Sequence, residues 1–199
     1  MRKNTVFRIV IIAAIVITAA VVIVMFCRTL ILTDAGETPA QDSSTEDQNS
    51  KLSRYDDGDG FCIKDGVLLA YIGSASEVEV PGDVTEIGED AFSSDMQRGV
   101  KLTKVTVPGT VKTIDQRSFS FTAADVIVIK EGVTSIGDSA FMDSYISEIW
   151  FPKSLTSIGD GIMSTEEGLW DTVIHLKKGS AADKYFKADM PYGDVKLEY

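Results

Sequence analysis

The chain has 199 residues, a formal net charge of −11 and a sequence pI of about 4.5. Nucleic-acid binding needs clustered Lys and Arg, so this acidic composition excludes nucleic acid as a partner. The length is that of one domain. The two cysteines, Cys27 and Cys62, exclude a disulfide framework because Cys27 lies in an apolar run.

Residues 9–27 form that apolar run, which contains no charged side chain and has an arginine at each end. As an α-helix it would measure roughly 28 Å, enough to cross a hydrocarbon core of about 30 Å. We expect a signal-anchor transmembrane helix, with the basic residues 1–8 in the cytoplasm and the rest outside the cell. A cleaved signal peptide and an acylated Cys27 are the alternatives, although the bulky residues before Cys27 favour neither.

Residues 28–60 are predicted to form a disordered acidic linker, because they offer few apolar side chains for a core of their own. The linker ends in DDGDG at residues 56–60, which invites a calcium interpretation. An EF-hand loop needs an oxygen ligand at position five and a Glu at position twelve, where this chain has Phe61 and Leu68. We therefore expect a solvated turn.

Residues 61–72 read FCIKDGVLLAYI, two apolar runs around Asp65-Gly66. Asp-Gly between two such runs is the strongest short signal for a β-hairpin. We expect this hairpin to cover the first coil of the array that follows, as an N-terminal cap.

A fifteen-residue phrase occurs four times in residues 78–163. The copies begin at residues 78, 105, 127 and 149 and read VEVPGDVTEIGEDAF, VTVPGTVKTIDQRSF, IVIKEGVTSIGDSAF and IWFPKSLTSIGDGIM. Steps of 27, 22 and 22 residues between these starts are typical of a stacked solenoid. No coil of this length offsets its own ordering entropy, roughly 1–2 kcal/mol per residue, so each coil must be stabilised by its neighbours.

Each phrase predicts a strand, a turn and a second short apolar segment. Positions one and three are apolar and flank a residue that points the other way, as in a strand. A Pro ends that strand in three copies. Gly88, Gly137 and Gly159 follow the second segment, where we expect a positive φ. The predicted inward pairs are Val78 and Val80, Val105 and Val107, Ile127 and Ile129, and Ile149 and Phe151.

The phrase resembles the leucine-rich repeats of the BspA type, which run strand, Pro, turn, Val/Leu-x-x-Ile-Gly and Ala-Phe. The resemblance covers about residues 61–199 and implies a repeat solenoid that is mainly β, with short turns and helical segments. It also implies display at a bacterial surface and a part in adhesion. Three departures, Lys130 for Pro, Asp115 for Gly and Ile162-Met163 for Ala-Phe, suggest a degenerate last coil.

Residues 173–199 are predicted to form the C-terminal cap. A fifth strand around His175 leads to a helix with Ser180 as its N-cap, which Pro191 stops. A last short strand alternates Val195, Leu197 and Tyr199.

Residue types that carry catalysis are scarce. His175 is the only histidine, and it lacks an evident nucleophile and orienting carboxylate, so we expect an exposed surface residue. Cys62 lies in an apolar hairpin, which is more typical of packing than of a nucleophile. Glu166 and Glu167 belong to a predicted solvated loop. We expect no enzyme, no cofactor and no metal site.

The best candidate for function is a row of side chains that point outward from successive strands. In register they would lie about 4.8 Å apart, with Trp150 at the centre of an apolar patch, the composition of a recognition hot spot. Alternatively, Trp150 folds over Val128 and covers a thin sheet. The candidate binding residues are Glu79, Thr106, Val128, Trp150 and His175.

These observations together predict a membrane-anchored, outward-facing domain that binds a protein or glycan at the bacterial cell surface without catalysis. The alternative is a structural or regulatory ectodomain that packs against a neighbouring envelope protein. An enzyme with an unfamiliar site would show turnover that disappears in a His175→Ala or Cys62→Ala variant.

Overall fold

The computed structural model describes residues 51–93, 102–165, 168–191 and 193–199, all within a compact unit that spans Ser43–Tyr199. The predicted anchor at residues 9–27 and the linker up to residue 50 lie outside the described residues, as do Glu166 and Glu167. No helix within the described ranges is long and apolar enough to cross a membrane.

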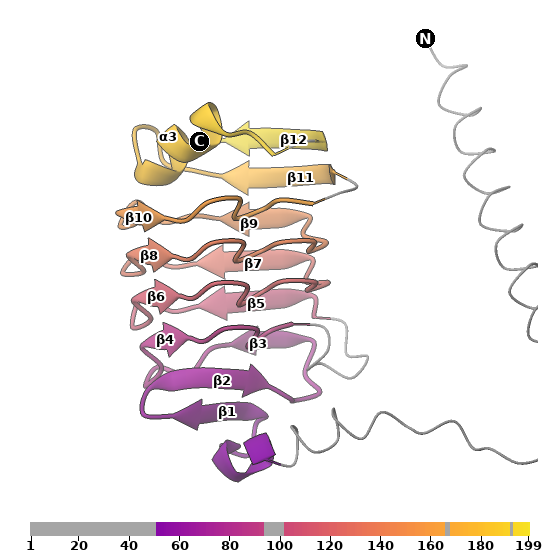
Figure 1. Ribbon diagram of the computed structural model, residues 1–199, viewed down its shortest axis with the longest axis vertical. Coiled ribbons are helices and arrows are strands. Elements are labelled where there is room, and N and C mark those ends of the chain that lie inside the picture. Colours follow the sequence, from indigo (N-terminus) through magenta and orange to yellow (C-terminus); the bar gives the residue numbers. More distant parts are fainter. Residues whose placement is uncertain (1–50, 94–101, 166–167, 192) are drawn as a thin grey trace, which may run out of the picture. The chain divides into compact units, whose positions relative to one another are not determined.

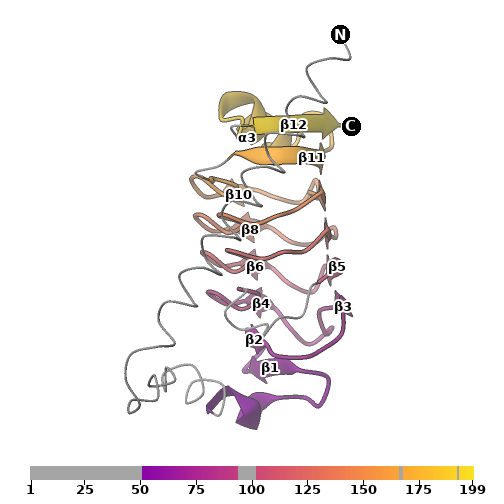
Figure 2. The ribbon, with the colours of Figure 1, turned by 90° about the vertical axis from the view of Figure 1, so that its right-hand side faces the viewer.

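The described residues form a solenoid with two sheets (Figures 1 and 2). The long-strand sheet has the order β12-β11-β9-β7-β5-β3, and the short-strand sheet has the order β1-β2-β4-β6-β8-β10. All neighbouring strands are parallel except in the β1–β2 hairpin. The predicted solenoid, mainly β, is therefore confirmed.

The chain alternates between the two sheets, so that each coil of the array gives one strand to each. The strands of the long-strand sheet are β3 (Glu77–Glu79), β5 (Lys104–Val107), β7 (Val126–Ile129), β9 (Glu148–Trp150), β11 (Leu169–His175) and β12 (Gly193–Glu198). Those of the short-strand sheet are β1 (Phe61–Lys64), β2 (Val67–Tyr71), β4 (Glu86–Ile87), β6 (Thr113–Ile114), β8 (Ser135–Ile136) and β10 (Ser157–Ile158). The described helices are η1 (Ser53–Tyr55) and α3 (Ala181–Ala188).

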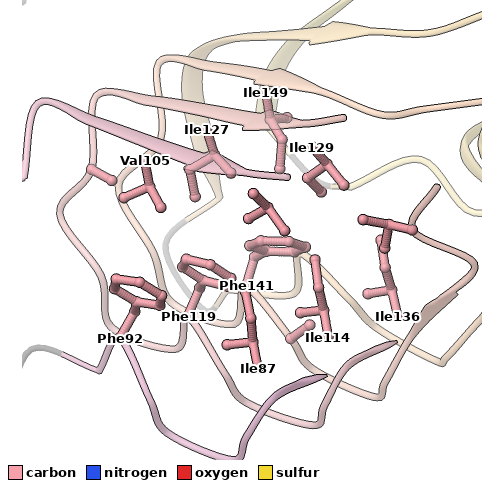
Figure 3. Close-up of a cluster of buried hydrophobic side chains, with 14 of the residues drawn as sticks. Ile87, Phe92, Val105, Ile114, Phe119, Ile127, Ile129, Ile136, Phe141 and Ile149 are labelled. Atoms are coloured by element: carbon pink, nitrogen blue, oxygen red, sulfur yellow. The ribbon is translucent and has the colours of Figure 1, made fainter. Parts of the chain in front are cut away.

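Equivalent residues of successive coils lie directly over one another. Val78 pairs with Val105, Val105 with Ile127, and Ile127 with Ile149, so the first inward position stacks through the whole array. Each of these side chains is at most 8% exposed. Isoleucines of the short-strand sheet point at them from the opposite side (Figure 3), so each coil supplies apolar surface for the next.

Aromatic rings stack along one side of this core (Figure 3). The rings of Phe92 and Phe119 lie nearly parallel, with centroids 4.8 Å apart, and Phe119 and Phe141 follow at 5.3 Å. Tyr71 of the hairpin continues the row at one end, 5.8 Å from Phe92. The final position of the repeated phrase therefore links coil to coil with a stacked ring.

The prediction of a positive φ at Gly88, Gly137 and Gly159 is wrong, because none of them adopts one. Close approach of the preceding coil requires glycine there. A Cβ on Gly88 would lie 2.9 Å from the carbonyl oxygen of Leu68, and one on Gly137 would lie 2.6 Å from the backbone nitrogen of Gln116. The left-handed residues come two positions later: Asp90 (φ 56°), Arg117 (52°), Ser139 (53°) and Gly161 (56°).

The N-terminal hairpin is present as the sequence indicates. Strands β1 and β2 pair antiparallel around Asp65 and Gly66, whose φ angles of 52° and 80° are those of a tight hairpin turn. Strand β2 then pairs in parallel with β4 and so becomes the first layer of the short-strand sheet. Cys62 of β1 is fully buried.

At the other end the chain adds two strands and a helix. Strand β11 begins at Leu169, before the predicted start of the cap at residue 173, and β12 pairs with it in parallel. Helix α3 packs against β10 and buries Phe186 completely. Its N-cap is Ser180, whose hydroxyl accepts the Asp183 N–H at 3.1 Å.

A Phe119→Ala substitution is expected to destabilise the unit by about 3–5 kcal/mol, because it removes the middle ring of the stack and leaves a cavity. Urea unfolding of residues 43–199 measures the effect. Phe121 is 51% exposed, so Phe121→Ala is the matched control and should change the free energy of unfolding by less than about 0.5 kcal/mol. Equal unfolding midpoints for both variants would show that the ring stack does not stabilise the array.

Asp183 ties the end of the chain to α3. Its carboxylate accepts hydrogen bonds from Lys187 Nζ at 3.0 Å, the Gly179 N–H at 2.7 Å and the Tyr199 hydroxyl at 2.9 Å. The bond from Lys187 contributes most and the bond from Gly179 next, and together these contacts lower the pKa of Asp183 from 3.8 to about 2.

Because this pKa is lower in the folded chain than in the unfolded one, the stabilisation is fully present above about pH 4 and is lost as the pH falls towards about 2. Asp183→Asn should remove this part of the acid sensitivity. Urea midpoints at about pH 5 and about pH 2 test this, with the exposed Asp83→Asn variant as control. Wild-type and Asp183→Asn proteins that lose equal stability over this range would contradict the assignment.

Candidate binding face on the long-strand sheet

The five candidate residues lie in one straight row across the long-strand sheet. Strand register pairs Glu79 with Thr106, Thr106 with Val128, Val128 with Trp150, and Trp150 with His175. The same register adds Glu198 of β12 beyond His175. A second row lies two residues earlier in each strand: Glu77, Lys104, Val126, Glu148, Val173 and Lys196. We call the two rows together the candidate face.

The centre of the candidate face is mostly apolar, with Glu148 between Val126 and Val173, and its ends are charged. Val126, Val128, Trp150 and Val173 are half-buried on adjacent strands, so they present apolar surface to solvent. Beyond β7 towards the N-terminal end, the outward side chains are Glu77, Glu79, Thr106 and Lys104. A flat apolar strip between charged borders is the arrangement of a protein-binding surface.

Glu79 is engaged by a residue two strands away. Lys130 follows β7 at the position where the other phrases carry Pro, and its ammonium lies 2.6 Å from the Glu79 carboxylate. Both side chains are about half exposed, so solvent screens the pair and it adds little stability. The residue that departs from the repeat, Lys130, therefore pairs with a charged residue at the N-terminal end of the candidate face.

Trp150 does not fold over Val128, the alternative that the sequence left open. Its ring stacks against His175 with centroids 4.0 Å apart and planes 5° from parallel. The expectation that His175 is an exposed surface residue is also wrong, since its side chain is only 22% exposed. The stack covers one face of each ring.

His175 lies between two carboxylates as well as against the indole. Its Nδ1 is 3.5 Å from Glu198 and its Nε2 is 3.8 Å from Glu148, both on neighbouring strands. Nε2 is buried and, among the described residues, has no hydrogen-bond partner. The pKa of the Glu198 carboxyl is lowered, mainly by a hydrogen bond from Lys196 and in smaller part by His175.

The described residues of the candidate face include neither a metal site nor a free thiol. Within the described ranges no three His, Cys, Asp or Glu side chains form a set that could hold a metal ion. Burial, followed by the negative charges of Asp56 and Asp57, raises the pKa of the Cys62 thiol from 9.0 to about 11, which disfavours the reactive thiolate. A hollow of about 300 Å³ near Met163 and Tyr185 lies away from both His175 and Cys62.

Sequence reasoning missed two exposed aromatic side chains. Phe121 is 51% and Tyr145 is 69% exposed, and both lie in the segments that lead back into the long-strand sheet. Phe121 also has a φ of 57°, an unfavourable backbone conformation for an aromatic residue. The sequence contained a signal for this residue, because the equivalent position of the next coil holds Asp143. An aspartate tolerates a positive φ better than a phenylalanine does, so the Phe at this position departs from the repeat.

The two-sheet coils with a repeated inward pattern define a repeat solenoid of the leucine-rich repeat class. The family model described as "BspA type Leucine rich repeat region" matches residues 68–187 in six copies. The chain belongs to this family. The match extends beyond the four predicted phrases, because it begins in β2 and ends in α3.

Three solved structures of bacterial origin are similar to the chain. A leucine rich repeat protein of T. pallidum is 17% identical, with a TM-score of 0.38 and coverage of 55% of this chain and 63% of that one. A leucine rich cell surface protein of Faecalibacterium prausnitzii is 20% identical, with a TM-score of 0.41 and coverage of 63% and 45%. A leucine-rich repeat protein of Eubacterium ventriosum is 27% identical, with a TM-score of 0.31 and coverage of 48% and 34%.

The chain therefore spans about one third to two thirds of the length of these relatives. Among curated proteins, no match was found.

Proposed function

We propose that this chain is a non-catalytic binding protein whose candidate face docks a partner outside the cell. The observation that carries the proposal is the strip formed by Val126, Val128, Trp150 and Val173, which stays half-exposed on a rigid sheet. A partner that covers this strip gains the free energy of burying apolar surface without ordering a loop.

The chemistry of the strip favours a protein over a glycan. Sugars bind through hydrogen bonds to their hydroxyl groups and by stacking on an open aromatic face. One face of Trp150 is occupied by His175, and of the neighbouring outward side chains Val126, Val128 and Val173 are apolar, while Glu148 adds one carboxylate. An extended or flat apolar segment of a protein, with charged residues at its ends, fits this surface better.

The same proposal includes a location. Residues 9–27 would anchor the chain in the cell membrane as a single-pass helix, and the acidic linker would hold the repeats away from the lipid surface. The basic residues 1–8 support a cytoplasmic N-terminus and extracellular repeats. The proposed protein needs no cofactor, metal or nucleic acid.

Trp150→Ala tests the binding role. Crosslinking on intact cells that produce the full chain, followed by mass spectrometry, should show at least about a tenfold loss of the captured partner. The reason is that a central aromatic residue contributes much of the binding free energy of a small interface. Tyr145→Ala is the matched control: it removes an aromatic side chain that is 69% exposed but lies off the face. Val128→Lys should have the same effect as Trp150→Ala.

Unchanged crosslinks in both Trp150→Ala and Val128→Lys proteins that unfold at the wild-type temperature would refute the site. Co-purification from detergent in a fixed stoichiometric complex would favour the structural role against a neighbouring envelope protein.

Protease treatment of intact cells tests the location. Peptides from the repeats should be released, whereas peptides from residues 1–8 should remain in the cell and still be joined to residues 9–27. A mature chain that begins after residue 27 would point to a cleaved signal peptide. A lipid on Cys27 would point to a lipoprotein, and repeats that stay protected would contradict an extracellular location.

A further inference from the structure

The two sheets have four edge strands within the part of the chain that the structure describes, and three of them are blocked. Residue Asp56 bridges to Cys62 of β1, which also carries a bulge. Helix α3 packs against β10. Strand β3 is only three residues long and carries two exposed glutamates. Short, charged, bulged or covered edges are the known means of preventing unwanted strand pairing.

Strand β12 is the exception. It is six residues long and contains no Pro, and no described segment pairs with its outer side. The carbonyl of Glu198 accepts the Leu176 N–H at 2.7 Å, so the even-numbered residues of β12 bond towards β11. The backbone N–H and C=O groups of successive residues in a strand point to opposite sides. Those of Val195 and Leu197 therefore face the free edge.

We propose that β12 pairs antiparallel with β12 of a second copy of this chain, which joins the two long-strand sheets into one. Only the odd-numbered residues can exchange hydrogen bonds across the edge, so the two-fold axis passes through Val195, Lys196 or Leu197. An axis at Lys196 would place two lysines opposite each other and Asp194 opposite Glu198, so like charges disfavour it and leave Val195 or Leu197. The backbone hydrogen bonds of this interface come from the edge of the sheet, and its charged contacts use Lys196 and Glu198 at the C-terminal end of the candidate face, two strands beyond Trp150.

The charges of β12 select a second copy as the partner. Its outward side chains alternate in sign, as Asp194, Lys196 and Glu198. Within one copy Lys196 also forms an exposed ion pair with Glu198, which solvent screens. With the axis at Val195, each Lys196 faces Asp194 of the other copy, and with the axis at Leu197 it faces Glu198. Both arrangements place opposite charges at the positions where cross-strand side chains approach most closely.

Packing adds to this pairing. Val195 and Leu197 point to the inner side of the sheet, where they pack against the core but remain half-exposed. A second copy of β12 places the same two apolar side chains beside them, so both copies lose exposed apolar surface. Because the interface is little more than one strand pair, we expect a reversible dimer.

Sedimentation velocity of the full chain in detergent micelles, over roughly 1–200 μM, tests the proposal. The wild-type chain should show a reversible monomer–dimer equilibrium. Lys196→Glu places two like charges opposite each other in either register, so it should weaken the dimer at least about tenfold. Lys178→Glu is the matched control, since it makes the same charge change at an exposed residue outside β12.

Two compensating variants identify the register. The double change Asp194→Lys with Lys196→Glu should restore the dimer if the axis passes through Val195. The double change Lys196→Glu with Glu198→Lys should restore it if the axis passes through Leu197. Restoration by either supports the proposal, provided that the thermal unfolding midpoint stays at the wild-type value.

The proposal is overturned by a wild-type chain that stays monomeric, or by a dimer that Lys196→Glu and Lys178→Glu affect equally. It is also overturned if neither double variant recovers the dimer. A dimer formed through residues 9–27, for example, would be indifferent to all of these changes in β12.

Discussion

Close contact between successive coils is the constraint on which the whole structure depends. The coils repeat at the spacing of neighbouring strands, about 4.8 Å, so every residue that points inward meets its own equivalent above and below. This is why the first inward position is Val or Ile in every phrase, and why Phe92, Phe119 and Phe141 form one stack. It is also why glycine occurs where the backbone of one coil touches the next.

A stack of this kind needs a separate solution at each end. At the N-terminal end the hairpin turns the chain back, so that β2 lies parallel to β4 and Tyr71 continues the ring stack. At the C-terminal end α3 covers the short-strand sheet, and Phe186 meets Phe151 with ring centroids 5.3 Å apart. The long-strand sheet continues through β11 to β12 instead, where its edge is left unpaired among the described residues.

The same stacking turns the outward side chains into a flat, rigid surface. Neighbouring positions on that surface come from residues about 22 apart in the chain, so each coil contributes its own chemistry to one column. Lys130 reaches two strands to Glu79, and His175 is held between Glu148, Glu198 and Trp150. Substitutions on such a surface can alter what it binds without a change of fold, because the outward side chains are not part of the hydrophobic core.

The sequence by itself determined the period, the strands, their inward residues and the row that contains Trp150. Each of these follows from a pattern that repeats four times. Once the strands pair in register, the register fixes which residues lie in the same row. The sequence also contained the hairpin, because Asp65-Gly66 defines a two-residue turn through local backbone preference alone.

Only the tertiary structure decided which way the side chains of that row turn. Trp150 lies on His175 and not over Val128, because that choice depends on packing between strands that are about 25 residues apart in the chain. The same applies to Gly88 and Gly137, where the deciding contact comes from the backbone of another coil. The open edge of β12 was equally hidden, since a strand reveals its partners only when the sheet is assembled.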